Sequence, residues 1–154
     1  SGRGRGWGRN LTFFKTLMSE PSWAETVRFV HERAAYTCEY CQTTQRVTGQ
    51  ALHVEHIIPD ANDHPDNLCL SCPSCNLSKA RAVTAVDPDT EEEVSLYNPR
   101  QQMWSDHFEW TYNGSIIRGL TPIGRATVVR LRMNLTRIVE ARKIWVRSGE
   151  HPPR

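Results

Sequence analysis

The sequence lacks any apolar run near the roughly 18–20 residues that a membrane-spanning helix needs. Its first residues also lack the apolar core of a secretory signal peptide. From these two absences we expect a soluble, cytoplasmic protein. Hydrophobic residues make up only 38% of the 154 residues, so we also expect a small core that would gain from an additional cross-link.

Lysine is scarce as well, because 16 of the 19 basic residues are arginine. Acidic residues are absent from residues 1–19, which carry a charge of +4, and rare in residues 118–154, which carry +7. Residues 20–117 between them carry −9. Because the arginine side chain suits bidentate contacts to phosphate, the basic ends favour a nucleic-acid partner, although solvated helix faces would give the same composition.

The length is that of one ordinary domain, and the sequence contains no internal repeat. We predict three parts along the chain. Residues 1–19 form a flexible basic arm rich in glycine and arginine, and residues 20–86 form the core. Residues 87–154 form an extension that packs on this core.

The core segment predicts a helix, two strands and a second helix. A capping box formed by Ser22 and Glu25 begins the first helix, whose apolar spacing continues to about residue 37. Residues 51–58 and 67–71 are expected to be strands, separated by a loop rich in Asp, Asn and Pro. A tight turn at residues 73–74 should then lead into a helix over residues 75–82.

The extension predicts an acidic loop, a hairpin and two helices. Residues 87–93 form the acidic surface loop, and a short helix should follow over residues 98–106. The Asn113-Gly114 pair predicts a hairpin of residues 108–112 and 115–118. Residues 121–146 should form one long helix with an apolar stripe and arginine on its other faces.

The five cysteines are clustered, which favours metal binding over disulfide bonds in a cytoplasmic protein. Two Cys-x-x-Cys pairs, Cys38 with Cys41 and Cys72 with Cys75, supply the four thiolates of a structural Zn²⁺ site. Cys69 with Cys72 has the same spacing, so the spacing leaves the second pair open. We prefer Cys72 with Cys75 because Cys69 falls within a predicted strand, between two leucines. A disulfide framework is the less favoured alternative.

A second group of functional candidates lies between and just after the cysteine pairs. Glu55 and His56 lie near the end of a predicted strand, and Asn76 begins the following helix. Carboxylate and amide oxygens are ligands for divalent cations, and a neighbouring imidazole can act as a base. One metal ion and one base suffice for phosphodiester hydrolysis.

These residues closely resemble the HNH endonuclease family in its four-cysteine branch. The resemblance covers residues 38–82 and is carried by the sequences LHVEHIIP, NLCL and CPSCNLSK. It implies an α+β fold with a ββα-metal core, also called a His-Me finger, held by the four-cysteine zinc site. The predicted N-terminal helix, C-terminal hairpin and long helix would surround this core. The tail is similar to the C-terminal extension of some bacterial stand-alone HNH proteins.

The resemblance also implies roles for four catalytic residues. His56 is the general base that activates water, and Glu55 and Asn76 bind the catalytic divalent ion. Asn67 braces the loop and helps to orient the histidine. The ion would be Mg²⁺ or Mn²⁺, with Ni²⁺ as an alternative, and the products would carry 5′-phosphate and 3′-hydroxyl ends.

Two features depart from the family pattern. Many members have aspartate where Glu55 stands, and the longer side chain can still reach a metal ion. The glycine pair often found before the middle asparagine is replaced by residues 62–66, Asn-Asp-His-Pro-Asp.

Other basic residues are candidates for binding the substrate. His53 lies on the same side of the strand as Glu55 and is expected to contact the metal ion or the phosphate, or to be a bystander. Lys79 is expected to contact phosphate or simply to be exposed on its helix. The full predicted nucleic-acid-binding set is His53, Lys79, Arg81, Arg125, Arg130, Arg132 and Arg137.

The sequence thus predicts an HNH endonuclease that hydrolyses double- or single-stranded DNA. Two alternatives remain at this point. The chain could be a catalytically inactive zinc-ribbon module that binds nucleic acid, or a nuclease subunit of a larger restriction or RNA-guided complex. A homodimer would also be compatible with the sequence.

Overall fold

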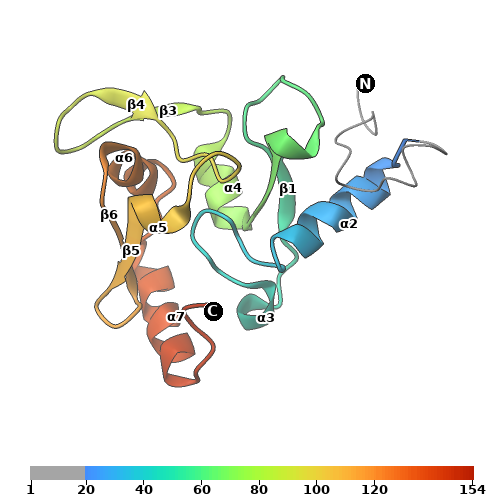
Figure 1. Cartoon of the computed structure of the whole chain (residues 1–154). Helices are drawn as coiled ribbons and strands as arrows, with labels where there is room; N and C mark the ends of the chain where they lie inside the picture. Colours follow the sequence, from blue (N-terminus) through green and yellow to red (C-terminus); the bar gives the residue numbers. More distant parts are fainter. Residues whose placement is uncertain (1–19) are drawn as a thin grey trace.

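Figure 1 shows a computed structural model of the chain, which describes residues 20–154. The predicted basic arm lies outside the described residues. The described part combines helices with three two-stranded antiparallel sheets, which confirms the α+β class. In Figure 1 the blue and green elements lie on the right and the yellow to red elements on the left. No described helix is long and apolar enough to cross a membrane.

Helix α2 (Trp23–Arg33) begins at the predicted capping box, with the Ser22 side chain accepting a hydrogen bond from the backbone N–H of Glu25. It ends earlier than predicted because the chain turns through two residues with positive φ, Ala35 at 51° and Tyr36 at 53°. The helix contacts both strands of the following hairpin.

Strands β1 (His53–His56) and β2 (Leu68–Ser71) form the predicted antiparallel pair. Their register places Glu55 opposite Cys69. The short helix α3 (Gln45–Thr48) precedes β1, and the 3₁₀ turn η1 (Pro65–Asn67) leads into β2.

Helix α4 (Pro73–Lys79) corrects the predicted turn at residues 73–74. Pro73 occupies the first helical turn, where its missing N–H costs nothing, and Cys72 is the N-cap residue. The helix ends before Ala80, because the φ of 50° at Ala80 breaks the helical conformation. The predicted end at residue 82 is therefore wrong.

Strands β3 (Thr84–Val86) and β4 (Glu93–Ser95) form a hairpin that was not predicted. The expectation of a solvated loop at residues 87–93 is wrong at its first residue, because Asp87 is fully buried. Its carboxylate accepts two hydrogen bonds from Arg125, each of 2.9 Å. The start of the acidic segment is thus tied to Arg125, later in the extension.

The predicted helix over residues 98–106 is reduced to α5 (Trp104–His107). The predicted hairpin is confirmed as β5 (Phe108–Thr111) and β6 (Ile116–Gly119). Its loop spans residues 112–115 and is longer than the two residues predicted, and Tyr112, Asn113 and Gly114 in it have φ of 48°, 55° and 84°.

The predicted long helix is two helices, α6 (Pro122–Arg130) and α7 (Thr136–Arg147). The chain leaves the helical path at Arg132, where φ is 53°. Asn134 then bonds both the N–H and the carbonyl of Ile117 in β6, at 2.9 and 2.8 Å. These side-chain bonds to a strand edge explain the interruption, which local apolar spacing does not reveal.

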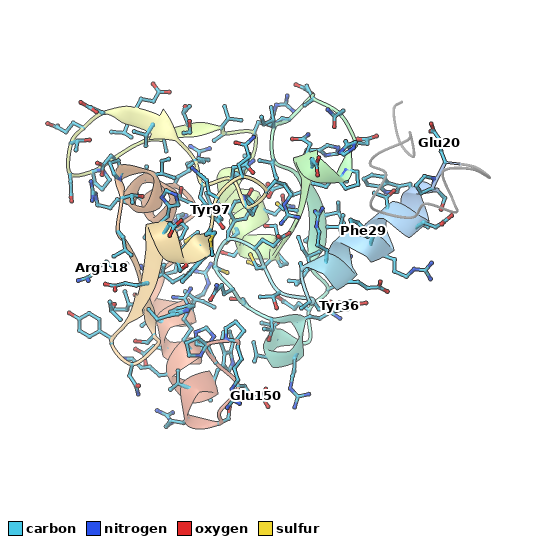
Figure 2. All side chains as sticks on the ribbon, in the orientation of Figure 1. Glu20, Phe29, Tyr36, Tyr97, Arg118 and Glu150 are labelled. Atoms are coloured by element: carbon cyan, nitrogen blue, oxygen red, sulfur yellow. The ribbon has the colours of Figure 1, made fainter. Side chains whose placement is uncertain are left out.

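The hydrophobic core contains residues of the hairpin β1–β2 and residues of the extension. It includes Tyr97, which is labelled near the middle of the molecule in Figure 2. The extension also docks on residues 38–43. Trp104 donates an indole hydrogen bond to the carbonyl of Tyr40 at 2.7 Å, and Trp110 donates one to Gln42 at 3.1 Å. Trp104 further packs on Phe108, so these aromatic rings belong to the packed interior.

Candidate functional site

The first cysteine pair lies in a tight turn over residues 38–43. The N–H of Gln42 bonds the carbonyl of Cys38, and the N–H of Cys38 bonds the carbonyl of Thr43, both at 2.9 Å. Gln42 has a φ of 64°, which lets the chain reverse so that Cys38 and Cys41 lie on one side. We call this turn the first knuckle.

The second pair lies at the start of α4. The backbone N–H of Cys75 points to the sulfur of Cys72 at 3.4 Å, so the helix N-cap and the cysteine pair are the same structure. The four sulfurs of Cys38, Cys41, Cys72 and Cys75 lie within 4.8 Å of one another, and all four residues are buried.

This cluster has the dimensions of a zinc site. A tetrahedral ion with Zn–S bonds of about 2.3 Å separates its sulfurs by about 3.8 Å, and the sulfurs of Cys41 and Cys72 are 3.7 Å apart. Hydrogen bonds with Cys38, Cys72 and Cys75 lower the pKa of Cys41, whereas burial raises the pKa of Cys38 and the hydrogen bond with Cys38 raises that of Cys75. The four cysteines could therefore bind a structural Zn²⁺.

Cys69 lies outside this cluster, as the sequence predicted. It is fully buried in β2, and its sulfur lies 3.5 Å from the hydroxyl of Tyr40. Burial raises the pKa of the Cys69 thiol well above its usual value. Its sulfur also lies 3.8 Å from Oε2 of Glu55, so Cys69 is a buried, hydrogen-bonding thiol outside the cysteine cluster.

Three predicted catalytic residues line one cleft of about 410 Å³: Glu55 and His56 from β1 and Asn76 from α4. Because the second cysteine pair starts α4, the same cluster that could hold zinc also fixes the position of Asn76. The remaining lining residues are Val54, Pro59, Asp60, Ala61, Asp63, Ala80 and Arg81.

Glu55 is 7% exposed, and its Oε1 atom is buried without a hydrogen-bond partner. The Lys79 ammonium lies 3.7 Å from this atom. Burial raises the pKa of Glu55 to about 7, and the charge of Lys79 opposes that shift. A buried oxygen with an unused acceptor site, beside an amide-bearing residue in the same cleft, fits a hard divalent cation.

His56 is more accessible, with 35% of its side chain exposed. Its Nε2 atom lies 2.7 Å from Oδ1 of Asp63, in the loop between β1 and η1. The Trp23 ring stacks nearly parallel to it, with centroids 6.5 Å apart. Sequence reasoning missed Asp63, and only the acidic character of the loop pointed to it.

Asn67 lies beside the cleft and braces its loop. Its Oδ1 accepts a hydrogen bond from the N–H of Ile58, and its Nδ2 donates to the carbonyls of Ile58 and Asn62, all at 3.0 Å. These three bonds reach loop backbone rather than His56. The three bonds are of the kind that a bracing residue makes. If Asn67 also orients His56, it must do so through the loop.

Lys79 differs from both sequence expectations. It is neither exposed nor placed for a phosphate contact, because its side chain is 1% exposed and its Nζ donates to the carbonyl of Ile57 at 3.1 Å. The helix turns this side chain inward, where it faces Glu55. His53 is exposed and lies outside the cleft lining.

The predicted substrate-binding arginines do not share one helix face. Arg81 lies at the cleft and pairs with Asp60, and both side chains are largely exposed. Arg125 is engaged by Asp87 and also lies 3.1 Å from Asp89. The remaining three are Arg130, which donates to the carbonyl of Lys79, and Arg132 and Arg137, which are exposed.

A second cavity of about 270 Å³ lies between the cysteine cluster and the extension. Arg132 and Arg137 line it, together with Arg142 and three of the clustered cysteines. Arg142 is fully buried, whereas its neighbours on α7 are exposed or half-buried.

Comparison with known proteins supports this interpretation of the cleft. Residues 38–81 match the sequence model of the HNH endonuclease family, and this segment contains all four clustered cysteines and the whole cleft lining. Searches of curated proteins and of solved structures found no match. Over residues 38–81 the chain is therefore similar to the HNH endonuclease family.

Proposed function

We propose that the protein is a metal-dependent endonuclease that hydrolyses phosphodiester bonds of DNA in the cleft of its HNH domain. The observation that carries this proposal is the meeting of Glu55, His56 and Asn76 in one cleft inside the matched segment. A carboxylate, an imidazole and an amide at one surface form the minimal set for metal-assisted hydrolysis.

In this proposal Glu55 and Asn76 hold a divalent ion, Mg²⁺ or Mn²⁺ with Ni²⁺ as an alternative. When bound, this ion would neutralise charge on the scissile phosphate and on the leaving oxygen. His56 takes a proton from the attacking water. The water oxygen bonds to phosphorus as the bond to the 3′ oxygen breaks. The 3′ oxygen then takes a proton from solvent water, which leaves 5′-phosphate and 3′-hydroxyl ends.

The cysteine cluster has a structural role in this scheme. It joins the first knuckle to the start of α4, and Asn76 directly follows Cys75. Zinc bound at this cluster would stabilise the folded state and would take no part in the reaction.

Substrate binding is assigned to exposed arginines. Arg81 is at the cleft itself, and Arg132 and Arg137 lie exposed in the extension. Each could neutralise a backbone phosphate, so binding should weaken as the salt concentration rises.

One observation favours a second function, a zinc-containing module that binds nucleic acid without cutting it. The buried ammonium of Lys79 lies close to Glu55 and already offsets part of the charge that a cation would meet. Such a competitor would weaken metal binding in the cleft.

Cleavage assays separate the two functions. Supercoiled plasmid, linear duplex and single-stranded DNA would be incubated with the protein and Mg²⁺, Mn²⁺ or Ni²⁺, beside a chelator control and His56→Ala. The nuclease proposal predicts metal-dependent cutting that His56→Ala loses. Salt-sensitive binding without cutting under any ion would favour the binding module, and equal cutting by both proteins would refute the assigned base.

A further inference from the structure

We propose that Asp63 is a positioning residue that fixes the ring orientation and the tautomer of His56. This inference rests on the proposed nuclease function and deepens it. The contact between His56 Nε2 and Asp63 Oδ1 is 2.7 Å long, and the Asp63 side chain is only 15% exposed. Both residues line the same cleft as Glu55 and Asn76.

The chemistry of the two groups decides which nitrogen carries the proton. An ionised carboxylate can only accept a hydrogen bond, so Nε2 must carry the hydrogen that faces Asp63. In the neutral imidazole the lone pair then lies on Nδ1. His56 can accept a proton from water at that nitrogen, and Asp63 stabilises the imidazolium that forms.

The loop around Asp63 is held by a network of short bonds. Nδ2 of Asn67 donates to the carbonyl of Asn62, and the Asn62 side chain accepts from the N–H of His64 at 2.9 Å. The N–H of Asn67 donates to the carbonyl of His64 at 2.8 Å. Asn67 thereby fixes both neighbours of Asp63, and this connects it to His56 without direct contact. The loop that replaces the family's glycine pair thus supplies the partner of the histidine.

The test compares Asp63→Asn with Asp66→Asn, a control in the adjacent turn η1 whose side chain is 84% exposed. We expect Asp63→Asn to lower the single-turnover rate of DNA cleavage by about 100-fold or more, with DNA affinity unchanged. Asp66→Asn should cleave like the wild type. Nitrogen NMR of the His56 ring at a pH where it is neutral should show the Nε2–H form in the wild type. It should show an increased Nδ1–H form in Asp63→Asn, because the amide can donate to Nε2.

The NMR result does not depend on activity, so the proposal and the proposed function can fail separately. A wild type that never cleaves DNA would refute the function, while the tautomer measurement would still decide the role of Asp63. An unchanged tautomer in Asp63→Asn, or a cleavage loss no larger than that of Asp66→Asn, would overturn the proposal. Weakened Mn²⁺ binding with an unchanged tautomer would instead make Asp63 a metal ligand.

A different observation concerns Arg142, which is fully buried next to the cysteine cluster. It lines the same cavity as Cys41, Cys72 and Cys75. Its guanidinium donates to the carbonyls of Ser115 and Met133 and to the amide oxygen of Asn134, at 3.1, 2.7 and 3.1 Å. These acceptors are neutral, its Nε has no partner, and no described carboxylate forms an ion pair with it. A buried guanidinium without an opposite charge is strongly unfavourable.

We infer that Arg142 is the counter-cation of the metal-loaded cluster and couples residues 87–154 to the zinc site. Four thiolates and one Zn²⁺ carry a net charge of about −2. The loaded cluster would therefore supply the negative charge that no described carboxylate provides to Arg142. The guanidinium also lies 5.1 Å from the ring centroid of Trp110, which bonds Gln42 of the first knuckle. Burial lowers the pKa of Arg142, and the neighbouring cysteines oppose this shift.

Zinc affinity measured by competition with a chelator tests this coupling. We expect Arg142→Gln to bind zinc at least tenfold more weakly than the wild type, Arg142→Lys to retain most of the affinity, and Arg147→Gln to match the wild type. Arg147 is an exposed residue of the same helix. A folded Arg142→Gln with wild-type zinc affinity would overturn the inference.

A second measurement covers the case in which Arg142→Gln does not fold. Removing zinc from the wild-type protein should speed amide hydrogen exchange in α7 and in residues 131–135, because the buried arginine loses its counter-charge. Unchanged exchange there, beside faster exchange in the first knuckle, would contradict the coupling.

Discussion

Replacing Glu55 by glutamine should stabilise the protein above neutral pH and stabilise it much less in mild acid. Burial raises the pKa of Glu55 from 4.5 to about 7, and Lys79 opposes the shift. One pKa unit corresponds to about 1.4 kcal/mol, so ionising this carboxylate in a cleft without a divalent ion costs about 3 kcal/mol. Glutamine has nearly the same shape and no charge, so Glu55→Gln should remove that cost.

The sign of this effect follows from proton binding. The folded protein holds the Glu55 proton more tightly than the unfolded chain does. The free energy of unfolding of the wild type should therefore fall as pH rises through the interval from 4.5 to about 7, and the contribution of Glu55 should level off above it.

Urea unfolding of zinc-loaded protein without added Mg²⁺ or Mn²⁺ measures the difference between the two proteins. At about pH 8.5 we expect Glu55→Gln to be more stable by about 3 kcal/mol, and at about pH 5 by only about 0.8 kcal/mol. Glu140→Gln, at a side chain that is 61% exposed, is the control and should change stability little at either pH. A difference for Glu55→Gln that is equal at both values would refute the reasoning.

Cys72→Ser should release zinc, whereas Cys69→Ser should retain it; metal analysis after gel filtration would detect the opposite pattern. Asn67→Ala removes three hydrogen bonds made by the Asn67 side chain and should lower the free energy of unfolding in urea by about 1–3 kcal/mol. An unchanged free energy of unfolding would contradict the bracing role. The Arg125 guanidinium holds the pKa of Asp87 well below its usual range, so wild-type stability should fall as pH drops below about 4, and Asp87→Asn should lose part of that acid dependence and be less stable at neutral pH. Mn²⁺ affinity of the cleft, measured by calorimetry, should fall by up to about tenfold per pH unit below the Glu55 pKa of about 7, and a pH-independent affinity would place the ion elsewhere.

The features that the sequence predicted well depend on neighbouring residues. The capping box at Ser22, the Asn113-Gly114 turn and the two Cys-x-x-Cys pairs each require only a few adjacent positions, and all three occur in the structure. The cluster contains Cys75 and not Cys69, as predicted, because Cys69 lies within a buried strand that directs it away from the cluster. Glu55, His56 and Asn76 could be placed together because the family motif fixes their spacing.

The features that the sequence missed depend on contacts between distant segments. Lys79 is turned inward by its pairing with Glu55, and Asp87 is buried by its contact with Arg125, 38 residues away. The break between α6 and α7 depends on the bonds of Asn134 to β6, which override helical spacing. Periodicity and propensity report the local chain alone, so they predicted a continuous helix and a solvated loop there.

The central claim is that His56 is the base of a metal-dependent nuclease, and the single-turnover cleavage rate of His56→Ala tests it most directly. The rate would be measured with saturating Mg²⁺ or Mn²⁺ on protein whose zinc content and DNA affinity match the wild type. Loss of a positioned general base predicts a rate lower by about 100-fold to 10,000-fold at unchanged DNA affinity. Equal rates for His56→Ala and the wild type would contradict the account.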